Sequence, residues 1–258
     1  MNNHEIDFKL FGEEMQCVEV ELDPNEAVIA EPGSFMMMTD GIQMQTLFGD
    51  GNQKGFMDKL FSAGKRLLTG ESLFMTVYTN NSNQKRQVTF AAPYAGKIIP
   101  MNLSKLGGKL ICQKDSFLCA AKGVAVGIEF QKKLGTGLFG GEGFIMQKLE
   151  GDGMAFVHSG GHVIEKQLQA GEILKIDTGC IVAFTSDVNY DIQFVGGIKN
   201  TLFGGEGVFY ALLSGPGKVW IQTLPISRLA GRILSYGTGS RKEEGSILGG
   251  IGNLLDGD

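Results

Sequence analysis

Short segments in which apolar and polar residues alternate run through most of the chain. Residues 18–22 (Val-Glu-Val-Glu-Leu), 128–130 and 191–194 all follow this period of two. Such a period places one row of side chains on a core and the other row in water. Glycine, asparagine and aspartate separate the segments at intervals of about eight to twelve residues, as in the hairpins of sandwiches and barrels. The pattern therefore predicts an all-β protein.

One segment of the chain occurs twice. Residues 138–143 and residues 202–207 both read Leu-Phe-Gly-Gly-Glu-Gly, so the second copy follows the first at an offset of 202 − 138 = 64. The same offset, called the repeat offset below, relates residues 128–130 to residues 192–194. An offset that is kept over about thirty residues indicates duplicated structure.

A third, degenerate copy lies nearer the N-terminus. Residues 69–75 (Thr-Gly-Glu-Ser-Leu-Phe-Met) align with residues 140–146 (Gly-Gly-Glu-Gly-Phe-Ile-Met). Upstream, residues 33–37 (Gly-Ser-Phe-Met-Met) resemble residues 115–119 (Asp-Ser-Phe-Leu-Cys). We therefore predict three β-sandwich units of one design and a glycine-rich C-terminal tail, at residues 1–93, 94–160, 161–225 and 226–258.

The first unit carries an insertion at about residues 54–68, which is the convincing helix candidate of the chain. Its apolar residues recur at spacings of three and four, and this period is typical of an amphipathic helix. Four cations surround the apolar stripe: Lys54, Lys59, Lys65 and Arg66. Such a helix can bind an anionic membrane or the acidic surface of a partner. The alternative is that it packs on its own sheet.

Composition narrows the class of protein. The chain has 258 residues, 39 of them glycine, and a net charge of −5, which gives no global attraction to nucleic acid. Cys17, Cys112, Cys119 and Cys180 form no C-x-x-C pair and lie in apolar segments, so we predict buried, reduced thiols. We see no signal peptide and no apolar run long enough to span a bilayer, and we expect a cytoplasmic protein.

The glycine-glutamate segments are the first candidate site. The residues common to the three copies are Gly70, Glu71, Gly141, Glu142, Gly205 and Glu206. If the units surround a pseudo-threefold axis, the three glutamates could form a carboxylate ring that binds a cation. The alternative is that each glutamate accepts hydrogen bonds from its own turn. A phosphate-binding loop is disfavoured, because a glutamate stands where phosphate requires a cation.

Few residues suit catalysis. His158 and His162 flank a Ser-Gly-Gly turn and supply too few ligands for a metal, and no G-x-S-x-G motif is present. The cationic residues 84–87 and 131–133 have no aromatic neighbours that would suit a nucleic-acid surface. We therefore expect no cofactor and no enzyme, but a scaffold or binding module that self-associates.

Several apolar residues are candidate contacts for a partner. Phe139 and Phe203 lie beside glycines in the repeated motif, and exposed apolar patches generally mark interaction surfaces. The run of Met36, Met37 and Met38 suits either an adaptable core or an apolar contact surface. We interpret it as core.

Three motifs together resemble a known family. They are the repeated L-F-G-G-E-G, the E-P-G-S-F-M-M-M of residues 31–38 and the D-T-G-C-I-V-A-F of residues 177–184. Over residues 15–225 the chain is similar to the bacterial and archaeal family whose eukaryotic branch is named for altered inheritance of mitochondria. The first unit departs from the repeat, with Thr69 where Gly140 and Gly204 stand in the others.

The resemblance implies a fold rather than an activity. It implies three β-sandwich units, each like the subunit of the tryptophan RNA-binding attenuation protein, around a pseudo-threefold axis. It implies no established biochemical activity. By analogy of fold alone, small-ligand or RNA binding is the alternative function.

Overall fold

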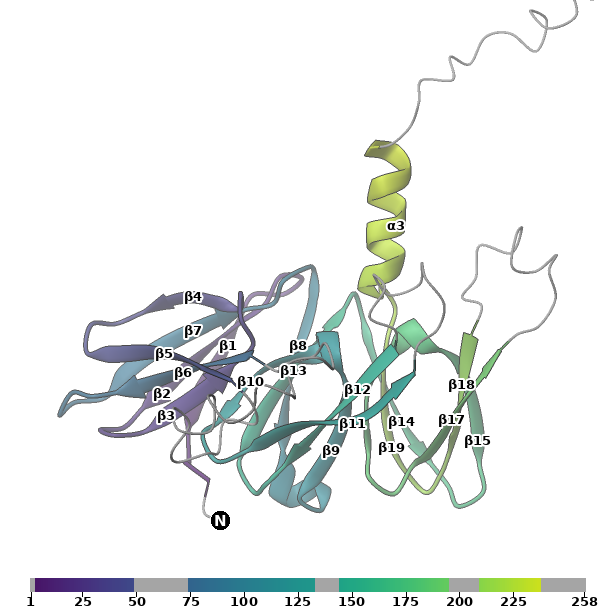
Figure 1. Ribbon diagram of the computed structural model, residues 1–258, viewed down its shortest axis with the longest axis horizontal. Coiled ribbons are helices and arrows are strands. Elements are labelled where there is room, and N and C mark those ends of the chain that lie inside the picture. Colours follow the sequence, from purple (N-terminus) through teal and green to yellow (C-terminus); the bar gives the residue numbers. More distant parts are fainter. Residues whose placement is uncertain (1–2, 49–73, 133–143, 195–208, 238–258) are drawn as a thin grey trace, which may run out of the picture.

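The computed structural model describes residues 3–48, 74–132, 144–194 and 209–237, and their regular structure is almost entirely antiparallel β-strand (Figure 1). The strands form four sheets. The first sheet contains, in spatial order, β1 (Asp7–Phe11), β2 (Cys17–Leu22), β7 (Arg86–Ala91) and β4 (Phe35–Met38). The second contains β5 (Ile42–Phe48), β6 (Phe74–Asn80), β3 (Ala27–Ala30), β10 (Phe117–Ala121), β13 (Met154–Gly160) and β8 (Gly96–Asn102).

The other two sheets lie toward the C-terminal end of the molecule (Figure 1). The third contains β11 (Ala125–Lys132), β12 (Phe144–Glu150), β9 (Lys109–Gln113), β16 (Ile181–Thr185), β19 (Gly217–Gln222) and β14 (Val163–Leu168). The fourth contains β15 (Ile173–Asp177), β18 (Phe209–Ser214) and β17 (Asn189–Phe194). The all-β prediction is therefore confirmed.

The strands of the second and third units begin at the repeat offset that the sequence shows. β9, β10 and β11 begin at positions 109, 117 and 125, and β15, β16 and β17 begin at positions 173, 181 and 189. The interval from β4 to β10 is longer, because these strands begin at positions 35 and 117. The division into three sandwich units stays a prediction, and the strand pairings do not show a pseudo-threefold axis within one chain.

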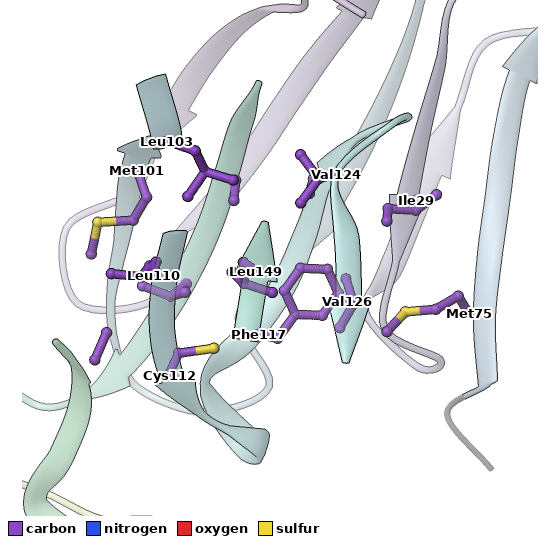
Figure 2. Packing of buried hydrophobic residues seen from close by; sticks show 14 of the residues in the cluster. Ile29, Met75, Met101, Leu103, Leu110, Cys112, Phe117, Val124, Val126 and Leu149 are labelled. Carbon is purple, nitrogen blue, oxygen red and sulfur yellow. The ribbon is translucent and has the colours of Figure 1, made fainter. Parts of the chain in front are cut away.

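Three hydrophobic clusters fill the spaces between successive sheets. Together they cover both faces of each six-stranded sheet. The middle cluster joins Phe117 of the second sheet to Val126 and Leu149 of the third (Figure 2). A second cluster lies between the first and second sheets, and a third between the third and fourth. As a result, β10 and β16 are buried at every residue. Such strands are continuous apolar runs, whereas β2, in an outer sheet, keeps the alternation of buried and half-buried residues.

One α-helix among the described residues was not predicted. The expected glycine-rich tail begins with α3 (Ile226–Gly237), which Figure 1 shows extending away from the sheets. The carbonyl oxygen of Pro225 accepts hydrogen bonds from the backbone N–H groups of Arg228 and Leu229 at the start of the helix. The Arg228 side chain also lies 3.5 Å from the Asp177 carboxylate. The predicted helix at residues 54–68 lies outside the described residues.

The interpretation of the methionine run as core is wrong. All four residues of β4 are exposed, from Met38 at 39% to Met36 at 54%. The reason is the place of the strand, since β4 is the last strand of the first sheet. Its apolar residues therefore lie on an open sheet edge.

Candidate functional site

All the site residues that the sequence suggested lie outside the described residues. They are Gly70, Glu71, Gly141, Glu142, Gly205 and Glu206 of the glycine-glutamate segments, the cations Lys54, Lys59, Lys65 and Arg66, and the aromatic residues Phe139 and Phe203. The three segments connect strands that are paired antiparallel with each other, β5 with β6, β11 with β12 and β17 with β18. The proposed carboxylate ring stays a prediction.

The structure instead shows a pocket of mixed polar and apolar lining where β3 meets β10. The pocket has a volume of about 460 Å³ and opens between the turn after β3 and the turn before β10. The turn after β3 is fixed by two hydrogen bonds: the Glu31 N–H donates to the Leu118 carbonyl at 3.0 Å, and the Ser34 hydroxyl donates to the Glu31 carbonyl at 2.7 Å. Polar and apolar side chains line the space, among them Glu31, Tyr94, Lys114, Asp115, Phe117, His158 and Ile226.

His158 contributes a buried imidazole to this pocket. The residue is only 2% exposed, and burial lowers its pKa to about 4, although a hydrogen bond with the backbone of Asp115 opposes the shift. Its Nδ1 atom is buried without a hydrogen-bond partner. The Tyr94 ring lies edge-on to the imidazole, with 5.0 Å between the ring centroids. The ring is therefore neutral at physiological pH and holds one unused acceptor.

The equivalent residue in the next unit is hydrogen-bonded differently. Gln222 follows His158 at the repeat offset, and its amide is satisfied twice. Its Nε2 donates to the Gly179 carbonyl and its Oε1 accepts from the Gly160 N–H, both at 2.8 Å. Gly96 precedes Gly160 at the same offset, and its N–H donates instead to the Glu14 carbonyl. The donor equivalent to the one that bonds Gln222 is thus paired with the N-terminal segment.

Glu31 adds a carboxyl group with a shifted pKa. Burial raises the pKa of Glu31 to about 7, nearby Lys114 lowers it, and Asp115 adds to the increase. Near neutral pH the group therefore exists in both forms and can donate or accept a hydrogen bond. An amphipathic molecule with a polar group at one end would find a hydrogen-bond partner in Glu31 and apolar contact with Phe117. This arrangement suits binding.

The described residues contain no group of three or more His, Cys, Asp or Glu side chains placed to hold a metal ion. Within the same ranges, no helix is both long and apolar enough to cross a membrane. None of the four cysteines is in a disulfide, and Cys112 and Cys119 are buried. Cys17 and Cys180 are only partly buried, so the prediction of buried thiols holds for two of the four.

Sequence reasoning considered His158 only as a metal ligand and did not select Glu31 or Tyr94. The available signal was the alignment of the turns that precede β4, β10 and β16. These turns read Glu-Pro-Gly-Ser at residues 31–34, Gln-Lys-Asp-Ser at 113–116 and Asp-Thr-Gly-Cys at 177–180. Aligned in this way, they mark a position at the ends of β3, β9 and β15 that is polar in all three units.

Comparison with known proteins identifies the family of this all-β chain. It belongs to the family described as mitochondrial biogenesis AIM24, which it matches over residues 8–224. An uncharacterised protein of Streptococcus pyogenes serotype M6 is 30% identical over 223 residues, which are 85% of this chain and 86% of that protein. The resemblance found in the sequence is therefore confirmed.

A solved structure supports the fold. The crystal structure of a Streptococcus pyogenes protein superposes with a TM-score of 0.71 and covers 90% of this chain and all of that one. Its sequence identity to this chain is 23%. At that level the likeness shows the fold alone.

The pH dependence of stability should reveal the buried state of His158. Its pKa falls from 6.5 to about 4 on folding. The contribution of the neutral His158 ring to the free energy of unfolding is therefore fully present above pH 6.5, and up to about 3 kcal/mol of it is lost as the pH falls toward 4. We expect His158→Gln, which copies Gln222, to remove this loss in denaturant titrations between pH 7 and 4. The exposed His162 provides the control, since His162→Gln should leave the loss unchanged. Equal acid sensitivity of the native chain and His158→Gln would contradict the prediction.

Proposed function

We propose that this protein is a non-catalytic scaffold that binds further copies of itself. The observation that carries the proposal is the exposed apolar edge of β4, where Phe35, Met36, Met37 and Met38 are 39% to 54% exposed. Edge strands with unpaired backbone groups and apolar side chains are templates for association with another chain. A protein that gained nothing from association would be expected to cover this edge or place charges along it.

The described polar residues also suit binding better than catalysis. Burial raises the pKa of the Cys112 and Cys119 thiols well above the ordinary value, so neither forms the thiolate that a nucleophile requires. His158, with a pKa of about 4, is too weak a base for efficient proton abstraction near neutral pH. These features support a role in binding rather than in catalysis.

Light scattering tests the self-association. We expect the mass-average molar mass to rise above that of one chain as the concentration increases through the micromolar range, because the β4 edge gains backbone hydrogen bonds and loses exposed apolar area on association. Addition of salt should strengthen the effect or leave it unchanged, since the edge is apolar. A single-chain mass at every concentration would remove the proposal.

Peripheral membrane contact is a further part of the proposed role. The predicted basic helix at residues 54–68 carries it, and α3 presents two exposed apolar residues, Ile233 and Leu234, each 61% exposed. Cations near an anionic surface contribute about 1 kcal/mol each. Four such cations would hold the protein at the surface weakly and in a salt-dependent way.

Liposome flotation with anionic vesicles at low salt tests this contact. Changing Lys54, Lys59, Lys65 and Arg66 to Gln should reduce recovery with the vesicles several-fold. A matched variant removes four other cations, which are exposed in the structure: Lys9, Lys105, Lys122 and Lys166. It carries the same net charge and should float like the native chain. Equal recovery of all three proteins would count against the basic helix.

Small-ligand binding is the second candidate function, and the pocket between Glu31 and His158 favours it. An amide probe such as acetamide could hydrogen-bond to the Glu31 carboxyl group within this pocket. We expect titration with this probe to shift the His158 ring signals in nuclear magnetic resonance spectra, because the imidazole lines the same pocket. The exposed His162 serves as the internal control. Parallel shifts of both histidines, or of neither, would speak against the pocket.

A further inference from the structure

The edge strands β4 and β15 lie at opposite ends of the molecule. Their equivalents in the other units are paired with a strand on each side. β10 pairs with β13 on one side and β3 on the other, and β16 pairs with β19 and β9. In the part of the chain that the structure describes, β4 pairs with β7 alone and β15 with β18 alone. Figure 1 shows β4 at one end of the row of sheets and β15 at the other.

A shared irregularity identifies equivalent residues in β4, β10 and β16. In its pairing with β7, β13 or β19, each of these strands changes register at the same place, just after its first residue. The shifts lie between Phe35 and Met37, between Phe117 and Cys119, and between Ile181 and Ala183. A bulge at the same position in three strands marks a common design. Met37 therefore corresponds to Cys119 and Ala183.

The internal junctions also fix which residues lie opposite each other. Cys119 lies opposite Ala30 in the first junction, and Ala183 lies opposite Cys112 in the second. The residue of β15 that corresponds to Cys112 at the repeat offset is Ile176. The residues opposite them on β12 and β18, Gln147 and Ala211, are related by the same offset. The third equivalent pair is therefore Met37 with Ile176.

Exposure shows that β4 lacks a neighbour which its equivalents have. Met36 and Met37 are 54% and 52% exposed. The corresponding residues at the internal junctions are at most 1% exposed: Leu118, Cys119, Val182 and Ala183. The internal residues are covered by the strands of the preceding unit. Among the described residues no strand pairs with the other edge of β4, so its methionines stay open.

We propose that β4 pairs antiparallel with β15 of a second copy of this chain, with Met37 opposite Ile176 and Met38 opposite Lys175. The proposal rests on the proposed self-association and names the partner surface and the register. The four strands of the first sheet and the three of the fourth would form one continuous sheet. Met37 would then cover the cluster to which Ile176 belongs, as Cys119 and Ala30 share a cluster at the first junction.

Lys175 distinguishes this third junction from the internal ones. Its equivalents are Ile29 and Ile111, both buried, whereas the Lys175 ammonium lies 5.7 Å from the centroid of the Tyr210 ring. Lysine on an edge strand opposes uncontrolled pairing, and its partial burial costs free energy. The junction between copies should therefore be weaker than the internal ones. Replacing Lys175 with isoleucine should strengthen it.

The contact is heterologous, because each copy uses a different edge toward each neighbour. Such contacts give a ring if the rotation between copies closes and an open filament if it does not. Either outcome requires two separate molecules at each junction. Pairing of β4 with β15 within one chain would instead bend the row of sheets back on itself.

Cross-linking tests the register directly. One chain carries Met38→Cys and a second, differently tagged chain carries Lys175→Cys, both in a Cys17→Ser, Cys180→Ser background. Directly opposite residues of an antiparallel pair have Cα atoms about 4.5–5.5 Å apart, within disulfide range. We expect a disulfide between the two tagged chains under mild oxidation. The control replaces Met38→Cys with Met44→Cys, since Met44 is also 54% exposed but lies on β5, and should give none.

A variant series separates this junction from self-association in general. Met36→Lys with Met37→Lys should weaken association by more than about 30-fold, because two charges would enter a closed junction. Met44→Lys should leave it unchanged and Lys175→Ile should strengthen it. Association that persists in the Met36→Lys, Met37→Lys chain, without the disulfide between chains, would overturn the junction and leave self-association standing. A disulfide within a single doubly substituted chain would also overturn it. A native chain that is monomeric at every concentration would remove both proposals.

Discussion

Strand pairing between successive units is the constraint on which this fold depends. The pairs β3 with β10 and β9 with β16 join six strands from neighbouring parts of the sequence into each central sheet. Each of these sheets then has a hydrophobic cluster on both faces. Neither pair could be removed without exposing buried backbone groups and apolar faces together, which costs far more than losing a surface contact. The four described sheets therefore form one continuously packed stack rather than separate domains.

The same stack explains how equivalent positions acquired different chemistry. Gln222 completes a hydrogen-bond network with Gly179 and Gly160, whereas Nδ1 of His158 at the equivalent place has no partner and Gly96 bonds to Glu14. The two equivalent positions therefore differ where the N-terminal segment contacts the second unit. The repeat gives His158 and Gln222 equivalent positions, and the contacts of the surrounding segments give them different hydrogen bonds.

Local pattern in the sequence predicted the strands and their repeat offset, because both depend on residues close together in the chain. It could not predict two-sided pairing. The apolar residues of β10 and the methionines of β4 look alike as sequence, yet β10 is buried and β4 is exposed, since only β10 has a preceding unit beside it. The pocket was missed for a related reason, because Glu31 and His158 meet only through long-range packing. α3 was missed because the glycine content of the later tail concealed its apolar spacing.

A row of repeated units that does not close ends in two different sheet edges. The side chains on these edges show whether the edges are protected against pairing with another chain. An edge strand that is protected against pairing with another chain usually carries charged side chains. Here β4 carries only apolar side chains, and β15 carries Ile173, Leu174 and Ile176 around the single cation Lys175. The two edges also keep the residue equivalence of the internal junctions, including the bulge in β4. That bulge lies in the pairing of β4 with β7 and places Met37 where Cys119 and Ala183 stand at the internal junctions. Because the residues of β4 are also apolar and exposed, the strand keeps the form of one half of a junction.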